Sequence, residues 1–172
     1  MFGEVFKRGF PCFIGVLALG AVVATPALAR SCATPSEMAA IQLRSLQTDL
    51  MVRALSCQQK ASYNNFMARF KGVLQTHAGD LKGYFNRVYA ANGTPELNAF
   101  LTDLSNMYAA KSMNATDAGF CEHSKGLFAT MLAVKSDALV QTALNYKSPH
   151  SIHACSATQM VQRDQQTNNK AR

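Results

Sequence analysis

The N-terminus of the chain combines, in order, positive charge, an uncharged apolar stretch and a pair of small residues. Lys7 and Arg8 supply the charge, and residues 13–25 carry none. An Ala-Leu-Ala sequence that ends at Ala29 fits the site that a signal peptidase reads. The apolar stretch is shorter than the roughly 20 residues that span a membrane. The sequence therefore predicts a signal peptide over residues 1–29, cleaved after Ala29. It also predicts a periplasmic or secreted protein with no transmembrane segment in its mature chain.

Five cysteines occur in the whole chain, and the predicted cleavage removes one of them, Cys12. Cys32, Cys57, Cys121 and Cys155 remain. An even number of cysteines in an exported chain is typical of a disulfide framework, because the destination is oxidising. The sequence therefore predicts two disulfides, for which the count alone allows three connectivities.

The mature chain has the apolar period of helices throughout. Apolar residues recur at alternating steps of three and four, which places them on one helical face. A capping box at 34–37 and a Thr-Pro-Glu sequence at 94–96 indicate helix starts, and Asn92-Gly93 indicates a helix end. We expect four helices, at about 35–55, about 63–91 with a kink near 77–80, about 94–111 and about 116–145.

Four amphipathic helices joined by short turns favour an all-α, up-down-up-down four-helix bundle over residues 30–161. In this topology Cys57 and Cys121 lie at one pole of the bundle, and Cys32 and Cys155 lie at the other. Any other pairing would span the length of a helix, about 30 Å, whereas a disulfide joins Cα atoms less than about 7 Å apart. The topology therefore selects Cys57–Cys121 and Cys32–Cys155.

Residues 162–172 are polar and without periodicity, which predicts a disordered tail. The formal net charge of the whole chain is +7, and the predicted signal peptide contributes one unit of it. The remaining basic residues are dispersed rather than clustered. Together with export, this dispersal argues against nucleic-acid binding.

Three histidines are candidate ligands for a metal or haem. His150 and His153 lie close before Cys155 in sequence, and the three side chains could together bind zinc or copper. His77 lies on the apolar stripe of the second expected helix, where it could ligate haem with a methionine from a facing helix. However, the predicted disulfide uses Cys155, and methionines commonly fill gaps in a core. The sequence therefore predicts no cofactor and leaves a haem- or metal-binding periplasmic bundle as the alternative.

Residues for catalysis are not grouped in the sequence. The carboxylates are scattered, and several fall in first turns of expected helices, where the helix dipole favours them. No G-x-S-x-G, H-E-x-x-H or phosphate-cradling glycine loop occurs. We therefore expect a protein that is not an enzyme.

The stretch from Leu43 to Leu132 contains the motifs Leu50-Met51, Ala54-Leu55-Ser56-Cys57, Tyr63-Asn64, Phe66, Phe70, Tyr84-Phe85 and Phe120-Cys121. Together these motifs resemble a group of small exported bacterial all-helical proteins of no assigned function. The resemblance implies an exported helical domain and contributes no catalytic residues. The sequence as a whole predicts a non-enzymatic binding or envelope-associated module, whose partner is an unknown protein or envelope component.

Overall fold

The computed structural model of the chain describes residues 31–113 and 117–170, and the predicted signal peptide over residues 1–29 lies outside them. Regular structure in the described residues is helical, apart from one isolated β-bridge between Ala33 and Ala154. This confirms the all-α class. The elements are α2 (Pro35–Ser56), α3 (Lys60–Arg69), α4 (Lys71–Tyr89), η1 (Ala90–Asn92), α5 (Gly93–Met113), α6 (Asp117–Ala133), α7 (Leu139–Leu144) and α8 (Ala157–Lys170).

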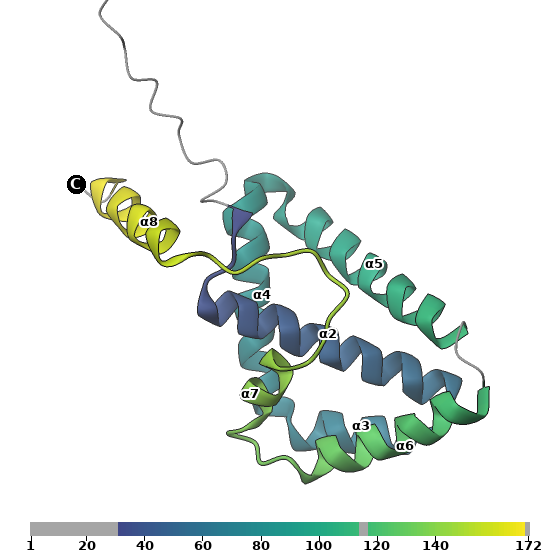
Figure 1. The fold of residues 1–172 in the computed structure, drawn as a ribbon. Coiled ribbons are helices and arrows are strands. Elements are labelled where there is room, and N and C mark those ends of the chain that lie inside the picture. The colour runs from purple at the N-terminus through teal and green to yellow at the C-terminus, as the bar shows by residue number, and fades with distance from the viewer. Residues whose placement is uncertain (1–30, 114–116, 171–172) are drawn as a thin grey trace, which may run out of the picture.

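Helix α2 is the centre of the fold and contacts α3, α4, α5, α6 and α7 (Figure 1). Its start is the predicted capping box: the Glu37 amide donates to Thr34 Oγ1 (3.2 Å), and the Thr34 amide donates to Glu37 Oε2 (2.8 Å). Its buried residues surround the axis instead of forming the single apolar face that the sequence suggested. They are Ala39, Ala40, Ile41, Leu43, Ser45, Leu46, Thr48, Asp49, Leu50, Val52, Arg53 and Ala54.

The expected up-down-up-down arrangement of four helices is not what the structure has. The second and fourth expected helices are each divided, into α3 with α4 and into α6 with α7. Figure 1 shows α4 crossing behind α2, while α3 turns away from α4 and runs beside α6. Straight helices over 63–91 and 116–145 would each be about 45 Å long, against about 33 Å for α2. Folding back keeps their apolar residues against the central helix.

The bend between α3 and α4 occurs at Phe70, not at the predicted kink near 77–80. Phe70 has φ −105° and ψ 14°, yet helical hydrogen bonds continue on both sides, from the Phe70 amide to Phe66 O and from the Leu74 amide to Phe70 O. Phe66, Phe70 and Leu74 all enter the core cluster that α2 shares with α3, α6 and α7. The bend therefore lies where these three side chains pack against α2.

The corner between α4 and α5 depends on close backbone contact. Helix α4 ends at Tyr89, and Ala90 has a positive φ of 52°. Gly93, predicted as part of a helix end, instead begins α5. A Cβ on Gly93 would lie 2.7 Å from Cα of Asn86, so only glycine allows the start of α5 to approach α4 this closely.

The polar tail also differs from the prediction, because residues up to Lys170 lie in helix α8. The Ser156 amide donates to Gln159 Oε1 (2.8 Å), and the Gln159 amide donates to Ser156 Oγ (3.3 Å). These two bonds form a capping box of the same type that starts α2. The predicted boundary at residue 162 therefore falls inside a helix whose sequence does carry a start signal.

Both predicted disulfides are confirmed. Cys32 and Cys155 have a Cα separation of 4.8 Å, and Cys57 and Cys121 one of 5.3 Å. The predicted pairing is right although the topology is not up-down-up-down, because the pairing depends only on which helix ends meet. Cys57 follows α2 directly and Cys121 lies near the start of α6, while Cys32 and Cys155 flank the α2–α7 body.

We expect the longer disulfide loop to contribute more to stability. Replacing Cys57 and Cys121 by alanine opens a loop with a sequence separation of 64, and replacing Cys32 and Cys155 opens one of 123. The chain-entropy relation gives losses of about 4 and about 5 kcal/mol in the free energy of unfolding. Urea denaturation of the two double variants and the unmodified protein measures both losses. Unchanged midpoints would contradict the assignment.

Candidate functional site

A groove of about 470 Å³ lies where the bend between α3 and α4 meets the middle of α2. Its walls are mainly apolar. A narrower extension continues along α2 and α4 towards Leu81. The residues that line the groove are Arg44, Gln47, Met67, Ala68, Lys71, Leu74, Gln75 and Ala78, and the extension adds Ala40, Leu43, His77 and Leu81.

Side-chain size explains why this surface is hollow. Ala68 and Ala78 are exposed and too short to fill the space, while Leu74 is buried and contributes to the floor. The bend at Phe70 separates the end of α3 from the start of α4, so both helices contribute walls. The groove therefore results from the same bend that divides the second expected helix.

Arg44 is the most unusual group in the groove. It is partly buried, and its Nη1 donates to Gln47 Oε1 (3.1 Å), whose amide nitrogen donates in turn to Met67 Sδ (3.3 Å). Within residues 31–113 and 117–170 no ion pair joins Arg44 to a carboxylate. Burial lowers the pKa of Arg44, and the nearby Tyr63 opposes this shift. Arginine nevertheless stays charged in proteins, so the groove contains an uncompensated cation.

A second polar group lies inside the fold, on another face of α2. Arg53 Nε donates to Asp49 Oδ2 (3.0 Å), and both side chains are less than 5% exposed. Arg53 Nη1 donates to Ser124 Oγ of α6 (3.0 Å), and its guanidinium lies 4.6 Å from the centre of the Phe120 ring. The Tyr146 hydroxyl donates to Asp49 Oδ2. Burial, and then this bond to the carboxylate, raise the pKa of Tyr146, so its hydroxyl stays protonated.

A neighbouring set of hydroxyl groups extends these contacts to α5. Ser45 Oγ lies 2.7 Å from the Tyr108 hydroxyl and also bonds to Ser148. Burial raises the pKa of Tyr108. Since Ser45 and Asp49 are one helical turn apart on α2, the two sets together connect α2 to α5, α6 and the segment after α7. Their role is structural, because the groups bond to one another within the core.

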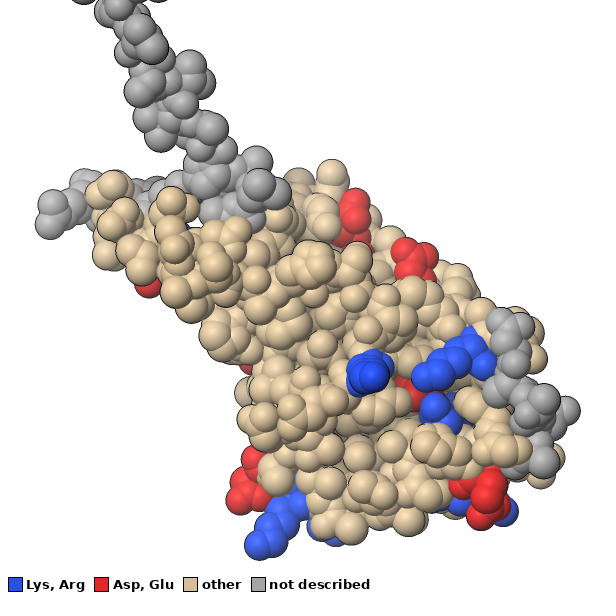
Figure 2. All heavy atoms as spheres, in the orientation of Figure 1, with Lys and Arg blue, Asp and Glu red and all other residues tan. Residues whose placement is uncertain are grey.

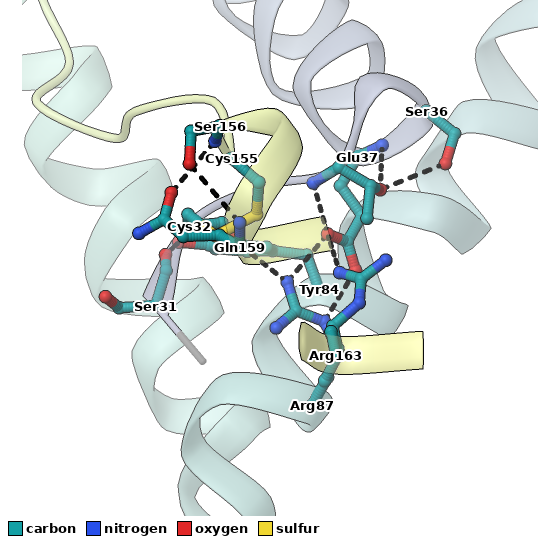
Figure 3. Close-up of a disulfide and its surroundings, with 11 residues drawn as sticks. Ser31, Cys32, Ser36, Glu37, Tyr84, Arg87, Cys155, Ser156, Gln159 and Arg163 are labelled. Carbon is teal, nitrogen blue, oxygen red and sulfur yellow. Dashed lines mark hydrogen bonds and ion pairs between the residues drawn. A yellow bond between two sulfur atoms is a disulfide. The ribbon is translucent and has the colours of Figure 1, made fainter. Parts of the chain in front are cut away.

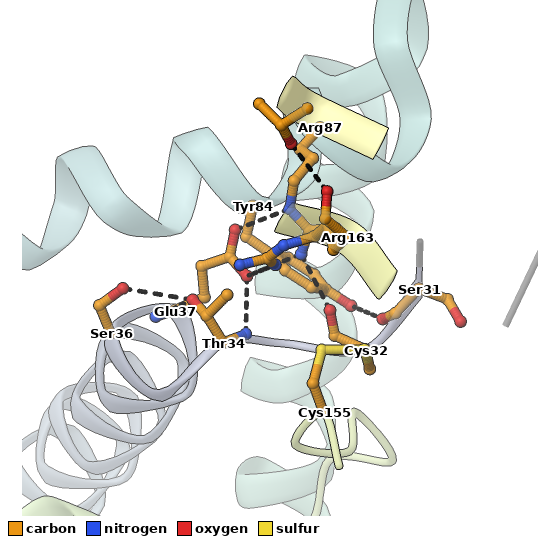
Figure 4. A network of polar contacts seen from close by, with 10 residues as sticks. Ser31, Cys32, Thr34, Ser36, Glu37, Tyr84, Arg87, Cys155 and Arg163 are labelled. Atoms are coloured by element: carbon orange, nitrogen blue, oxygen red, sulfur yellow. Dashed lines mark hydrogen bonds and ion pairs between the residues drawn. A yellow bond between two sulfur atoms is a disulfide. The ribbon is translucent and has the colours of Figure 1, made fainter. Parts of the chain in front are cut away.

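The pole that carries Cys32–Cys155 contains an arginine–glutamate clasp, defined by Glu37, Arg87 and Arg163 (Figures 3 and 4). Arg87 Nε donates to Glu37 Oε1 (2.8 Å) and Arg87 Nη2 to Glu37 Oε2 (2.6 Å). Arg163 Nη1 of α8 lies 3.9 Å from Glu37 Oε2. Burial would raise the pKa of Glu37, but the bonds from Arg87 and Thr34 outweigh it and lower that pKa.

Backbone contacts complete this pole. Arg87 Nη2 donates to Cys32 O (2.9 Å), and the Tyr84 hydroxyl donates to Ser31 O (2.8 Å), as Figure 4 shows. Burial raises the pKa of Tyr84 to about 12. The Ala33 amide donates to His153 O (2.9 Å), and the Cys155 amide donates to Ala33 O (2.8 Å). The clasp and the disulfide therefore hold the first and last parts of the domain together.

The histidines that the sequence singled out do not form a ligand set. His150 is partly buried, with its ring centre 6.3 Å from that of Phe100, while His153 is exposed and Cys155 is in a disulfide. His77 lies in the narrow extension of the groove, with Nδ1 3.3 Å from Asp80 Oδ2. In the described parts of the chain, no group of three or more His, Cys, Asp or Glu side chains could hold a metal ion.

Sequence reasoning missed Arg44, Asp49 and Arg53 as notable residues. The Asp49–Arg53 spacing of four, between the apolar positions Leu46, Leu50 and Ala54, was a usable signal for a buried pair. Nothing comparable marked Arg44, because its isolation depends on which side chains the bend brings near it.

The described surface in Figure 2 is sparsely charged, and no described helix is suited to span a membrane. Figure 2 shows a face that is mostly uncharged, with few charged side chains of mixed sign. Among the described helices, none combines the length and the apolar character needed to cross a membrane. Comparison of the chain with protein-family models, curated proteins and solved structures found no match.

Breaking the buried ion pair should be far more costly than breaking an exposed one. Arg53→Leu leaves Asp49 buried without its cation, which costs about 3–5 kcal/mol of unfolding free energy. The matched control is Lys125→Leu, which breaks the exposed Lys125–Glu122 pair and costs at most about 1 kcal/mol. Urea denaturation measures both. Similar losses in the two variants would contradict the structural role given to Arg53.

Acid should destabilise the fold first through His150. Burial, and then His153, hold the pKa of His150 below 6.5, so the unfolded chain takes up this proton more readily than the folded one. The contribution of neutral His150 to the free energy of unfolding is therefore fully present above about pH 6.5, and it is lost as the pH falls below that value. The lowered pKa of Glu37 adds a second loss below about pH 4.5.

Urea midpoints between pH 7.5 and 5.5 measure the first of these losses. His150→Gln should flatten the dependence over that range. His123→Gln, at an exposed position, should leave it unchanged. A dependence that survives His150→Gln would contradict this assignment.

Proposed function

We propose that this chain is a non-enzymatic binding protein of an extracytoplasmic compartment, and that its ligand occupies the groove between α2, α3 and α4. The observation that carries the proposal is the groove itself, in which most of the exposed surface is apolar. Small-molecule sites are typically concave, about 300–1,000 Å³ in volume and mainly apolar, with a small number of polar groups that orient the ligand. The groove matches this volume and apolar surface, and Arg44, Gln47, Lys71 and Gln75 supply its polar groups.

Two disulfides support the proposed compartment, because such bonds persist where the environment is oxidising. The rigidity of the α2 wall supports the binding role. Arg44 and Gln47 project from a helix whose other faces pack against α5, α6 and α7. A preformed wall lowers the ordering cost of binding. A binding module of the envelope is the role that best unites these features.

The second candidate is a haem-binding bundle in which His77 supplies a ligand. His77 is partly buried beside the main groove, in an extension that is itself too narrow for haem. A haem titration of the purified protein tests this candidate. A Soret band that is lost in His77→Ala would favour haem over the first proposal.

A neutral fluorescent probe, N-phenyl-1-naphthylamine, tests the proposed site. We expect saturable binding with increased fluorescence. Ala78→Trp should weaken it about tenfold or more, because the indole fills the groove. Ala129→Trp on the exposed face of α6 is the matched control and should bind as the unmodified protein does. The chain has no native tryptophan, so quenching of the introduced Trp also locates the probe. Equal affinity of the two variants for the probe would contradict the proposal.

A further inference from the structure

Arg44, Arg53 and Arg87 are each withdrawn from water to some extent, but they differ in what neutralises their charge. Arg53 is paired with Asp49, and Arg87 is paired with Glu37. Arg44 is also withdrawn from water, but its hydrogen-bond partner is the neutral amide of Gln47. A partly dehydrated cation without a counter-charge is unfavourable unless another group supplies the charge. Arg44 is therefore in place for an anion from outside the chain.

The other residues of the groove also favour an anionic ligand. Lys71 of α4 also lines the groove, and none of the described residues that line the groove or its extension is acidic. The formal charge of the groove lining is therefore positive. Arginine binds carboxylate or phosphate oxygens through two parallel N–H bonds, which a neutral or cationic group cannot accept in the same way.

The apolar residues that line the groove are suited to contact a hydrocarbon chain. Met67 and Leu74 offer apolar surface next to Arg44, and Ala68 and Ala78 leave space beside them. Methionine adapts its shape to irregular apolar ligands. A volume of about 470 Å³ lies in the lower half of the small-molecule range and accommodates a single chain.

From this combination we infer that the groove takes a single-chain amphiphile with an anionic head group, the head held by Arg44 and the chain lying against Met67 and Leu74. This inference rests on the proposed function and specifies the ligand class for the same groove. The occupant is a fatty-acid-like monocarboxylate. Hydrocarbon burial supplies affinity that any such chain shares, and Arg44 supplies the preference for negative charge.

Three ligands with the same twelve-carbon chain separate these contributions. Dodecanoate, 1-dodecanol and dodecyltrimethylammonium, each kept below its aggregation limit, compete with bound N-phenyl-1-naphthylamine on the purified protein. We expect dodecanoate to bind about ten- to hundredfold more tightly than dodecanol, the range for a hydrogen bond to a charged group. The cationic ligand should bind most weakly.

Arg44→Met removes the charge but keeps an apolar stem of similar length. In this variant we expect dodecanoate and dodecanol to bind about equally, with dodecanol affinity unchanged. Arg44→Lys keeps the charge without the paired donors and should restore part of the preference. Lys82→Met, at an exposed position of α4 outside the groove, is the matched control and should keep the full preference. Circular dichroism and urea midpoints establish that each variant is folded.

The outcomes distinguish the inference from the proposal beneath it. Equal displacement by dodecanoate and dodecanol on the unmodified protein would overturn the anionic ligand class while leaving a groove that binds apolar compounds. A preference for dodecanoate that persists in Arg44→Met would also overturn the role of Arg44. Failure of all three ligands to displace a probe that still binds would overturn the inference alone. The absence of probe binding would remove both the inference and the proposed function.

Discussion

The structure depends on an ion pair that is closed off from water in the middle of its central helix. Burying Arg53 and Asp49 together is favourable only if their remaining donors and acceptors find partners, because the desolvation cost of each ion is several kcal/mol. The partners come from other elements: Ser124 from α6 and Tyr146 from the segment after α7. These polar contacts join α2 to α6 and to the segment after α7, in addition to the apolar contacts that the same elements share.

The two charged faces of α2 have different roles. On one face Arg53 is paired with Asp49 and bonded to Ser124 within the core. On another face Arg44 has a neutral partner and borders the groove. Because the first face is fixed by packing, the second is presented as a rigid wall. The sequence places these two arginines nine residues apart on the same helix, and only their surroundings give them different roles.

Local features of the sequence predicted what local physics controls. The capping box at Thr34, the extent of α2 and α5, and the pairing of the four cysteines follow from hydrogen bonding at helix ends and from which ends meet. The bend at Phe70 and the division after Ala133 could not be predicted, because continuous helical patterns cover both places. Both places lie where side chains pack against α2, which is a tertiary effect. The groove depends on the bend at Phe70, so neither the groove nor the isolation of Arg44 could be read from the chain.

The two disulfides are nested, and this has a consequence for how the protein matures. A chain that enters an oxidising compartment N-terminus first presents Cys32 and then Cys57, long before Cys121 and Cys155 arrive. The first two thiols to emerge are not partners, since they stand at opposite ends of α2. Oxidation in order of arrival would join them and prevent that helix from forming. The native bonds therefore require that oxidation wait for the C-terminal cysteines, or that an early bond be exchanged by thiol attack. Whichever bond forms first, the pair of native disulfides is complete only once Cys155 is available, at the end of the α2–α7 body.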